Sequence, residues 1–157
     1  MDFLLWSARS LHVFSVVVWF GGMLYQAVVT LPVARVEQKQ LDPFVRHLSG
    51  RFQPFVWMCV WTIVITGAVL MLFDPRFLFL NFDSLWSVLL AAKQCVFVLM
   101  VFFGFGYARM FSRLETALTT GEPEEQAMQF YNQMLMFGKI NVALAIIALL
   151  LASGMSS

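Results

Sequence analysis

The sequence predicts an all-α integral membrane protein, a four-helix bundle whose helices all cross the membrane. Its 157 residues are 61% hydrophobic and only 12% charged, and its mean hydropathy is +0.80. A soluble globular domain carries about 25% charged residues, roughly twice this share. Four long apolar runs alternate with polar segments, so we expect a single domain, residues 1–157, with spans at about 5–31, 53–73, 84–108 and 134–154.

Each apolar run is long enough to cross the hydrocarbon core of a bilayer, which takes about 20 residues of helix. The first run has no Asp, Glu, Lys or Arg between positions 9 and 35, and the second has none between positions 51 and 74. The third is interrupted only by Lys93, and the fourth carries Lys139 early and continues as INVALAIIALLLASG. Lipid permits only helices or closed barrels, and these runs are too continuous for barrel strands. The spans are therefore expected to be helices.

Three linkers join the spans. Residues 35–53 carry charges of both signs, and a short helix is expected after Asp42-Pro43, because Asp caps a helix and Pro suits its first position. Residues 74–83 are short and aromatic, as in the belt at a membrane interface. Residues 109–133 are polar, and TGEPEEQ predicts a turn followed by the start of a helix.

Basic residues near the helix ends predict the orientation, because cytoplasmic loops carry an excess of Lys and Arg. The first and third linkers contain Arg35, Lys39, Arg46, Arg51, Arg109 and Arg113, whereas the opposite side offers Arg9 and Arg76. Six basic residues against two place the first and third linkers in the cytoplasm. Both termini are then expected outside the cytoplasm.

The composition also excludes several classes of function. A formal net charge of +1 without clustered Lys and Arg does not suit a nucleic-acid partner. Cys59 and Cys95 lie in apolar runs without a CxxC pair, so neither a disulfide framework nor a zinc site is indicated. The chain has no nucleophile elbow, HExxH or P-loop, so hydrolytic chemistry is unsupported. The lipid bilayer is the one partner that composition predicts.

Polar and small residues within the spans fall on stripes of helical spacing, and such stripes are expected to face the bundle interior. The stripes are His12, Ser15, Trp19, Gly22 and Gln26 in the first span; Cys59, Thr62 and Thr66 in the second; Trp86, Lys93, Phe97, Met100 and Gly104 in the third; and Gly138, Asn141, Ala145, Ala148 and Ala152 in the fourth.

Depth along the helices predicts that three of these polar side chains meet. His12, Thr66 and Lys93 each lie about eight residues from the outer end of a span, roughly 12 Å at 1.5 Å per residue. One level of the bundle would thus hold an imidazole, a hydroxyl and an amine. The second histidine, His47, falls in a cytoplasmic linker and is expected too far away to share a ligand with His12.

Each candidate has an ordinary structural alternative. His12 is either a cofactor ligand or a buried imidazole that is hydrogen-bonded to a neighbouring helix. Lys93 either meets a partner inside the bundle or extends its ammonium toward the interface. The glycines beside Trp19 are more often a packing feature than part of a cofactor site.

Several segments resemble known membrane families. LHVFSVVVWFGGMLYQAVVTLPVAR, RFQPFVWMCVWTIVITG and LWSVLLAAKQCVFVLM resemble the first three helices of the copper-resistance D (CopD) family. The related HemJ-type protoporphyrinogen oxidases share the size, a first-helix His before a Trp, a third-helix Lys, and a last-helix Asn, here Asn141. The resemblance implies a bacterial membrane protein concerned with copper or haem b. It also implies that His12 and Lys93 occupy the positions important for haem binding.

Three functional hypotheses remain open. The first is a haem b protein that transfers electrons or oxidises a porphyrin or quinol. His12 would then be the axial ligand and Lys93 a second ligand or catalytic proton-handling group, with Thr66, Trp19 and Asn141 supporting the cofactor. The second is copper binding or transport, in which thioether and thiolate ligands would hold Cu(I). The third is an accessory subunit of a larger membrane complex, without chemistry of its own. Whether the chain forms a homo-oligomer is left open by the sequence.

Overall fold

The computed structural model describes residues 2–30, 43–73, 85–121 and 123–154, and these residues are almost entirely helical. The elements are α1 (Asp2–Tyr25), its π-helical continuation η1 (Gln26–Thr30), α3 (Pro43–Leu72), α4 (Leu85–Thr120) and α5 (Glu124–Gly154). In this described part, four helices are long and apolar enough to cross a membrane. The predicted all-α, four-helix membrane architecture is confirmed.

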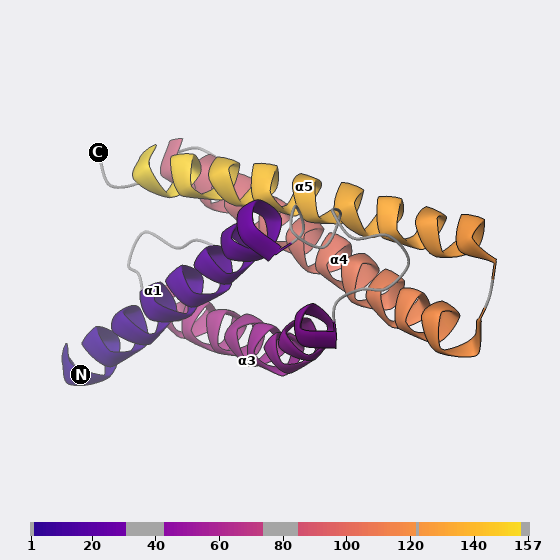
Figure 1. The fold of residues 1–157 in the computed structure, drawn as a ribbon. Coiled ribbons are helices and arrows are strands. Elements are labelled where there is room, and N and C mark those ends of the chain that lie inside the picture. Colours follow the sequence, from indigo (N-terminus) through magenta and orange to yellow (C-terminus); the bar gives the residue numbers. More distant parts are fainter. Residues whose placement is uncertain (1, 31–42, 74–84, 122, 155–157) are drawn as a thin grey trace.

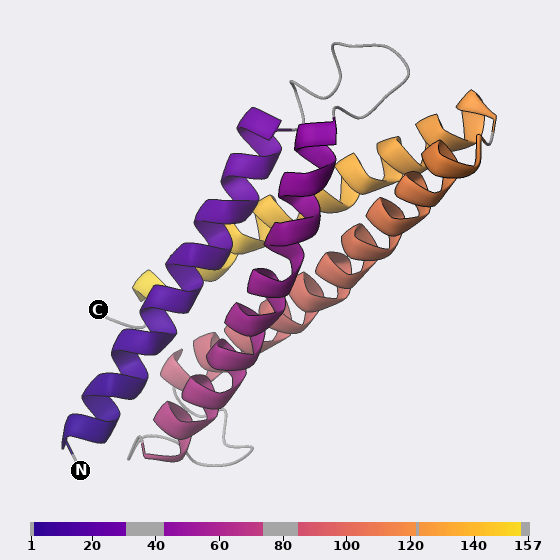
Figure 2. The same ribbon diagram turned by 60° about the horizontal axis from the view of Figure 1, so that its bottom comes forward.

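The bundle consists of two helical hairpins. α1 packs mainly against α3, and α4 packs along α5, whereas contacts between the two pairs are fewer (Figures 1 and 2). Two contacts that link α3 to α4 are an edge contact between the rings of Trp57 and Phe105, 6.2 Å apart, and a hydrogen bond from Gln94 to the sulfur of Met71. The start of α1 and the end of α5 lie toward one end of the bundle, and the α4–α5 turn lies at the other (Figure 2).

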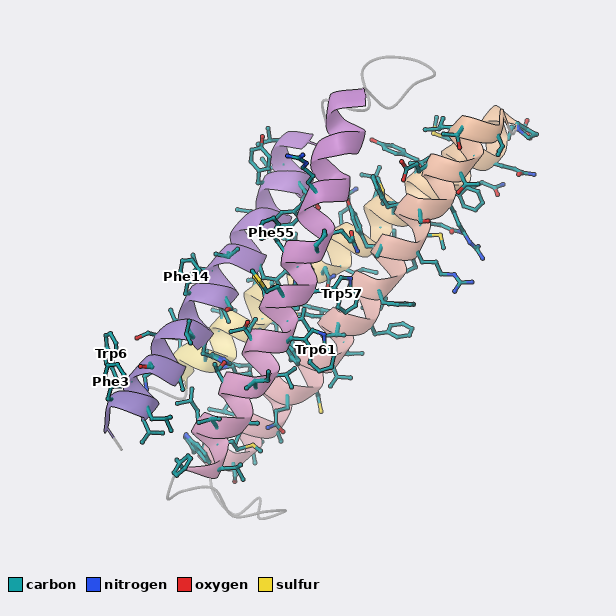
Figure 3. The ribbon with its side chains drawn as sticks, turned by 90° about the horizontal axis from the view of Figure 1, so that it is seen from below. Phe3, Trp6, Phe14, Phe55, Trp57 and Trp61 are labelled. Atoms are coloured by element: carbon teal, nitrogen blue, oxygen red, sulfur yellow. The ribbon has the colours of Figure 1, made fainter. Side chains whose placement is uncertain are left out.

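The outer surface of the bundle is strongly apolar. Phe3, Trp6 and Phe14 lie along the outer side of α1 (Figure 3). Their side chains are 78%, 65% and 66% exposed, respectively. Trp61 on α3 is similarly exposed. Soluble monomers rarely expose apolar surface on this scale. The surface is instead suited to contact with the acyl chains of a lipid bilayer.

Two clusters of buried side chains form the interior. The central cluster draws on all four helices and consists of Trp19, Cys59, Val60, Ile63, Met100 and Ala145. The second cluster, Met110, Phe111, Leu114 and Met134, belongs to α4 and α5 alone. The α4–α5 hairpin therefore has a core of its own beyond the region where α1 and α3 pack.

The helices extend further than the predicted spans. α4 continues twelve residues past position 108 to Thr120, and α5 begins at Glu124 rather than near position 134. Polarity led to the interpretation of 109–133 as a linker, but its apolar residues recur every three or four positions and pack across the hairpin. The turn predicted from TGEPEEQ is confirmed, and Gly121 adopts a φ of 71° there, a conformation that glycine tolerates best.

The start of α3 also differs from expectation. A short helix is expected after Asp42-Pro43, and a helix does begin at Pro43. It is not confined to the linker, because α3 runs without a break from Pro43 to Leu72 and neither Gly50 nor Pro54 ends it. The π-helical η1 was not anticipated at all. The proposed cap Asp42 and the aromatic segment 74–83 lie outside the described residues.

Candidate functional site

The predicted polar level of the bundle centres on a contact between α1 and α3. The Nδ1 atom of His12 lies 2.9 Å from the Thr66 hydroxyl oxygen. Thr66 is buried, and its hydroxyl donates its single proton to the backbone carbonyl of Thr62, at 2.5 Å, or of Ile63 one residue further along. In the arrangement in which this hydroxyl donates to its own helix, its oxygen accepts from His12, so that Nδ1 carries the ring proton and Nε2 holds the lone pair.

Gly67 makes room for the imidazole ring. A Cβ atom at this position would lie 3.3 Å from Cε1 of His12 and 3.7 Å from Nδ1. The glycine thus allows α1 and α3 to approach closely enough for the His12–Thr66 hydrogen bond to form. Gly67 directly follows Thr66 in the sequence but was not predicted to be a site residue.

Lys93 supplies a positive charge near this pair from α4. It is half-buried, and it interacts electrostatically with His12. The four spans contain no acidic residue at this depth, since their only carboxylates are Glu115 and Glu125 far along the α4–α5 hairpin. Three helices therefore bring an imidazole, a hydroxyl and an amine to the same region, as the depth of the residues predicts.

Trp19 and Asn141 lie elsewhere. Trp19 is two helical turns further along α1, buried in the central cluster, with its ring edge against Phe97 at a centroid distance of 5.9 Å. Together with Asn141 it lines a cavity of about 40 Å³ in the other half of the bundle. The structure therefore separates the five predicted site residues into a His12–Thr66–Lys93 region and a distinct cavity that we call the Asn141 cavity.

The Asn141 cavity has a mixed polar and aromatic lining drawn from every helix. Besides Trp19 and Asn141, its walls include Gln26 in η1, Gln53 and Phe52 in α3, and Gly104, Tyr107 and Gly138 in the α4–α5 hairpin. Gln26, Gly104 and Gly138 were predicted to face inward. The side-chain amide of Gln53 and the hydroxyl of Tyr107 were not predicted as site groups. Gln53 is the last residue of the expected first linker, and Tyr107 lies two residues before the expected third linker.

The inward stripes predicted from helical spacing are confirmed by burial. Ser15, Trp19, Cys59, Thr66, Met100, Asn141 and Ala145 are buried, and the other members of the stripes are partly buried. His47 lies near the start of α3, nineteen residues before Thr66, which corresponds to roughly 28 Å along a helix. It cannot share a ligand with His12.

The predicted metal ligand at this site is a single histidine, His12. No group of three or more His, Cys, Asp or Glu side chains lies close enough to hold a metal ion in the part of the chain that the structure describes. A haem iron needs only an axial ligand from the protein, and a neutral imidazole whose Nδ1–H is already hydrogen-bonded is the usual form of that ligand. His12 does not line the Asn141 cavity, so that cavity is not where His12 would hold a macrocycle.

Comparison of the chain with models of known protein families, with curated proteins and with solved structures found no match.

Proposed function

We propose that this protein is an integral membrane haem b protein in which Nε2 of His12 is the axial ligand of the iron. The observation that supports this best is the His12–Thr66 hydrogen bond, which directs the proton to Nδ1 and leaves the Nε2 lone pair available. Bound haem would supply one-electron redox chemistry in a water-poor setting. The protein would act in electron transfer or in the oxidation of a porphyrin or quinol.

Lys93 is the second functional group in this proposal. Its ammonium lies near His12, and none of the four described spans has an acidic residue at this depth. Placing such a charge inside a membrane is costly, so it favours a functional role. In the neutral form the amine could serve as a sixth ligand or move protons to and from a substrate. In the charged form it would attract the propionate groups of a porphyrin.

The proposed location of the protein rests on the family resemblance and on the distribution of basic residues. We place it in the bacterial inner membrane, as the CopD and HemJ resemblance implies, with both termini outside the cytoplasm. The excess of basic residues around the first and third linkers supports this orientation. His12, Thr66 and Lys93 would then lie in the outer half of the membrane.

The test is the visible absorption of the protein purified in mild detergent, before and after addition of haem. A Soret band that travels with the protein and shifts on reduction is expected. A preparation that stays colourless after incubation with haem would remove the proposal. The chain's own membrane topology would be unaffected by that outcome.

Copper handling is the second candidate, and one observation favours it. Cys59 and Met100, two sulfur-containing side chains from α3 and α4, are both buried in the central cluster. Thiolate and thioether sulfur are the ligands that Cu(I) prefers. Metal analysis after mild purification, with Met100 or His12 replaced, distinguishes the two candidates. Copper that is lost on substitution while the visible spectrum stays unchanged would favour copper over haem.

A further inference from the structure

The Asn141 cavity lies in the half of the bundle opposite His12, and it extends from near the membrane surface toward the middle. Gln53 lies three residues inside the second span, which begins at Gly50. Trp19, at the inner end, lies ten residues before Val29, the last residue of the first span, which is roughly 15 Å at 1.5 Å per residue. That depth is about half of a hydrocarbon core of roughly 30 Å.

Asn141, which lines this cavity, has a buried side-chain oxygen without a hydrogen-bond donor among the described residues. The residue is only 3% exposed, and its Oδ1 atom has no hydrogen-bond partner among the described residues. A buried amide oxygen without a donor is unfavourable, so native structures almost always satisfy one with protein or with ordered water. Because Oδ1 is an acceptor, the group that satisfies it must donate a hydrogen bond, and Asn141 is one of the residues that line the cavity.

The size of the cavity limits the donor. A water molecule needs about 10–15 Å³ of such space, so a cavity of about 40 Å³ holds about three. An aromatic headgroup would not fit without movement of the helices. Amide groups of Gln26 and Gln53 and the hydroxyl of Tyr107 also line the cavity, and they offer the two to four polar partners that a buried water requires.

We propose that the Asn141 cavity is a water-binding inlet that opens at the end of the bundle where α1 finishes and α3 begins. A water molecule donates to Oδ1 of Asn141, and further waters continue along Gln26 and Gln53 toward the surface. The buried ring of Trp19 closes the inner end and separates this water from the central cluster and from His12. The inlet does not depend on haem or copper.

Cysteine accessibility tests the inlet directly, because a methanethiosulfonate reagent reacts with a thiolate only where water reaches it. Met23 lines the cavity, whereas its neighbour Leu24 at the same depth is 40% exposed on the outer side of α1. Met23→Cys and Leu24→Cys would each be made with Cys95→Ala, and Cys95→Ala alone gives the background. The reagent is 2-aminoethyl methanethiosulfonate, applied to the full protein in lipid vesicles. We expect Met23→Cys to react with it at least about tenfold faster than Leu24→Cys. Equal rates would overturn the inlet.

Asn141→Leu then tests the role assigned to the amide. Leucine has a similar volume but no hydrogen-bonding group, so the water loses its innermost partner. In the Met23→Cys background we expect the reaction rate to fall at least about fivefold, since a lone apolar wall does not retain water. An unchanged rate would overturn the assignment of the water to Asn141. Because the comparison of Met23→Cys with Leu24→Cys uses the native Asn141, it decides the inlet even if Asn141→Leu does not fold.

Discussion

Nδ1 of His12 lies 2.9 Å from the hydroxyl oxygen of Thr66, a residue fifty-four positions later in the chain. When the Thr66 hydroxyl donates to the Thr62 carbonyl of its own helix, its oxygen is the acceptor for Nδ1–H of His12. The orientation of the imidazole, and the availability of Nε2, therefore depend on a side chain of a different helix. Four expected outcomes follow from this contact and from the packing around it.

Replacing Thr66 by Val removes the acceptor for His12 Nδ1 while preserving a branched side chain. Loss of a partner that orients a ligating histidine typically weakens binding about 10–100-fold, so we expect haem affinity to fall by that factor. Titration of the purified protein with haem, followed by absorbance, measures it. Thr62→Val is the matched control, since the Thr62 hydroxyl donates to the Met58 carbonyl of its own helix. Equal affinities for the two variants would mean that Thr66 does not orient His12.

Gly67→Ala introduces a methyl group 3.3 Å from Cε1 of His12. The ring must shift by a few tenths of an ångström, which lengthens its hydrogen bond to Thr66. We expect haem affinity to fall about three- to tenfold, a smaller loss than that from removing the acceptor outright. Gly50→Ala on the same helix, where an added Cβ meets nothing within 4 Å, is expected to bind as the native protein does. A Gly67→Ala variant with native affinity would contradict the proposed close fit.

Gly22→Ala tests the packing between α1 and α3. A Cβ atom there would overlap the ring of Phe52, whereas one at the adjacent Gly21 would meet nothing within 4 Å. Overpacking typically costs about 1–3 kcal/mol, and we expect a value near the low end because the Phe52 ring can turn into the adjoining cavity. Thermal unfolding in detergent would show Gly22→Ala less stable than Gly21→Ala. Adding Phe52→Ala should cancel the difference, and a strictly additive double variant would refute the contact.

Lys93→Met removes a charge that lies within the membrane near His12. An ionised side chain at the centre of a span costs about 2.5–3.5 kcal/mol in insertion measurements, and half-burial among protein groups reduces that figure. We therefore expect stability in lipid to rise by about 1–3 kcal/mol while redox activity is lost. Lys139→Met, at an exposed position, should change stability less. If Lys93→Met were the less stable protein, the amine would have to be paired in the native state.

Much of the arrangement could be predicted from the sequence because lipid leaves polar side chains few places to go. The spacing of His12, Ser15 and Trp19 predicts the inward-facing stripe of α1, in which Ser15 and Trp19 are buried. Counting residues from the outer end of each span brought His12 and Thr66 to one level. A helix rises by a constant amount per residue, so the count predicted a contact across fifty-four positions.

The position of Asn141 could not be predicted in the same way. Its level depends on the register between α4 and α5, and that register is set by a hairpin whose turn lies at Gly121, well beyond the predicted span ends. The mean polarity of residues 109–120 alone predicts a linker. Its apolar residues pack across the hairpin, with Leu114 and Ala117 buried, and they extend both helices. Asn141 was consequently grouped with His12, although it lines a cavity in the other half.

The absorption spectrum of His12→Ala, recorded beside that of the native protein after both have been incubated with haem, tests the account most directly. We expect a Soret band in the native protein that is absent or strongly shifted in His12→Ala, with helix content unchanged in both. Added imidazole should restore part of the band by occupying the vacated position. An identical spectrum in the two proteins would contradict ligation by His12, however well the fold survives.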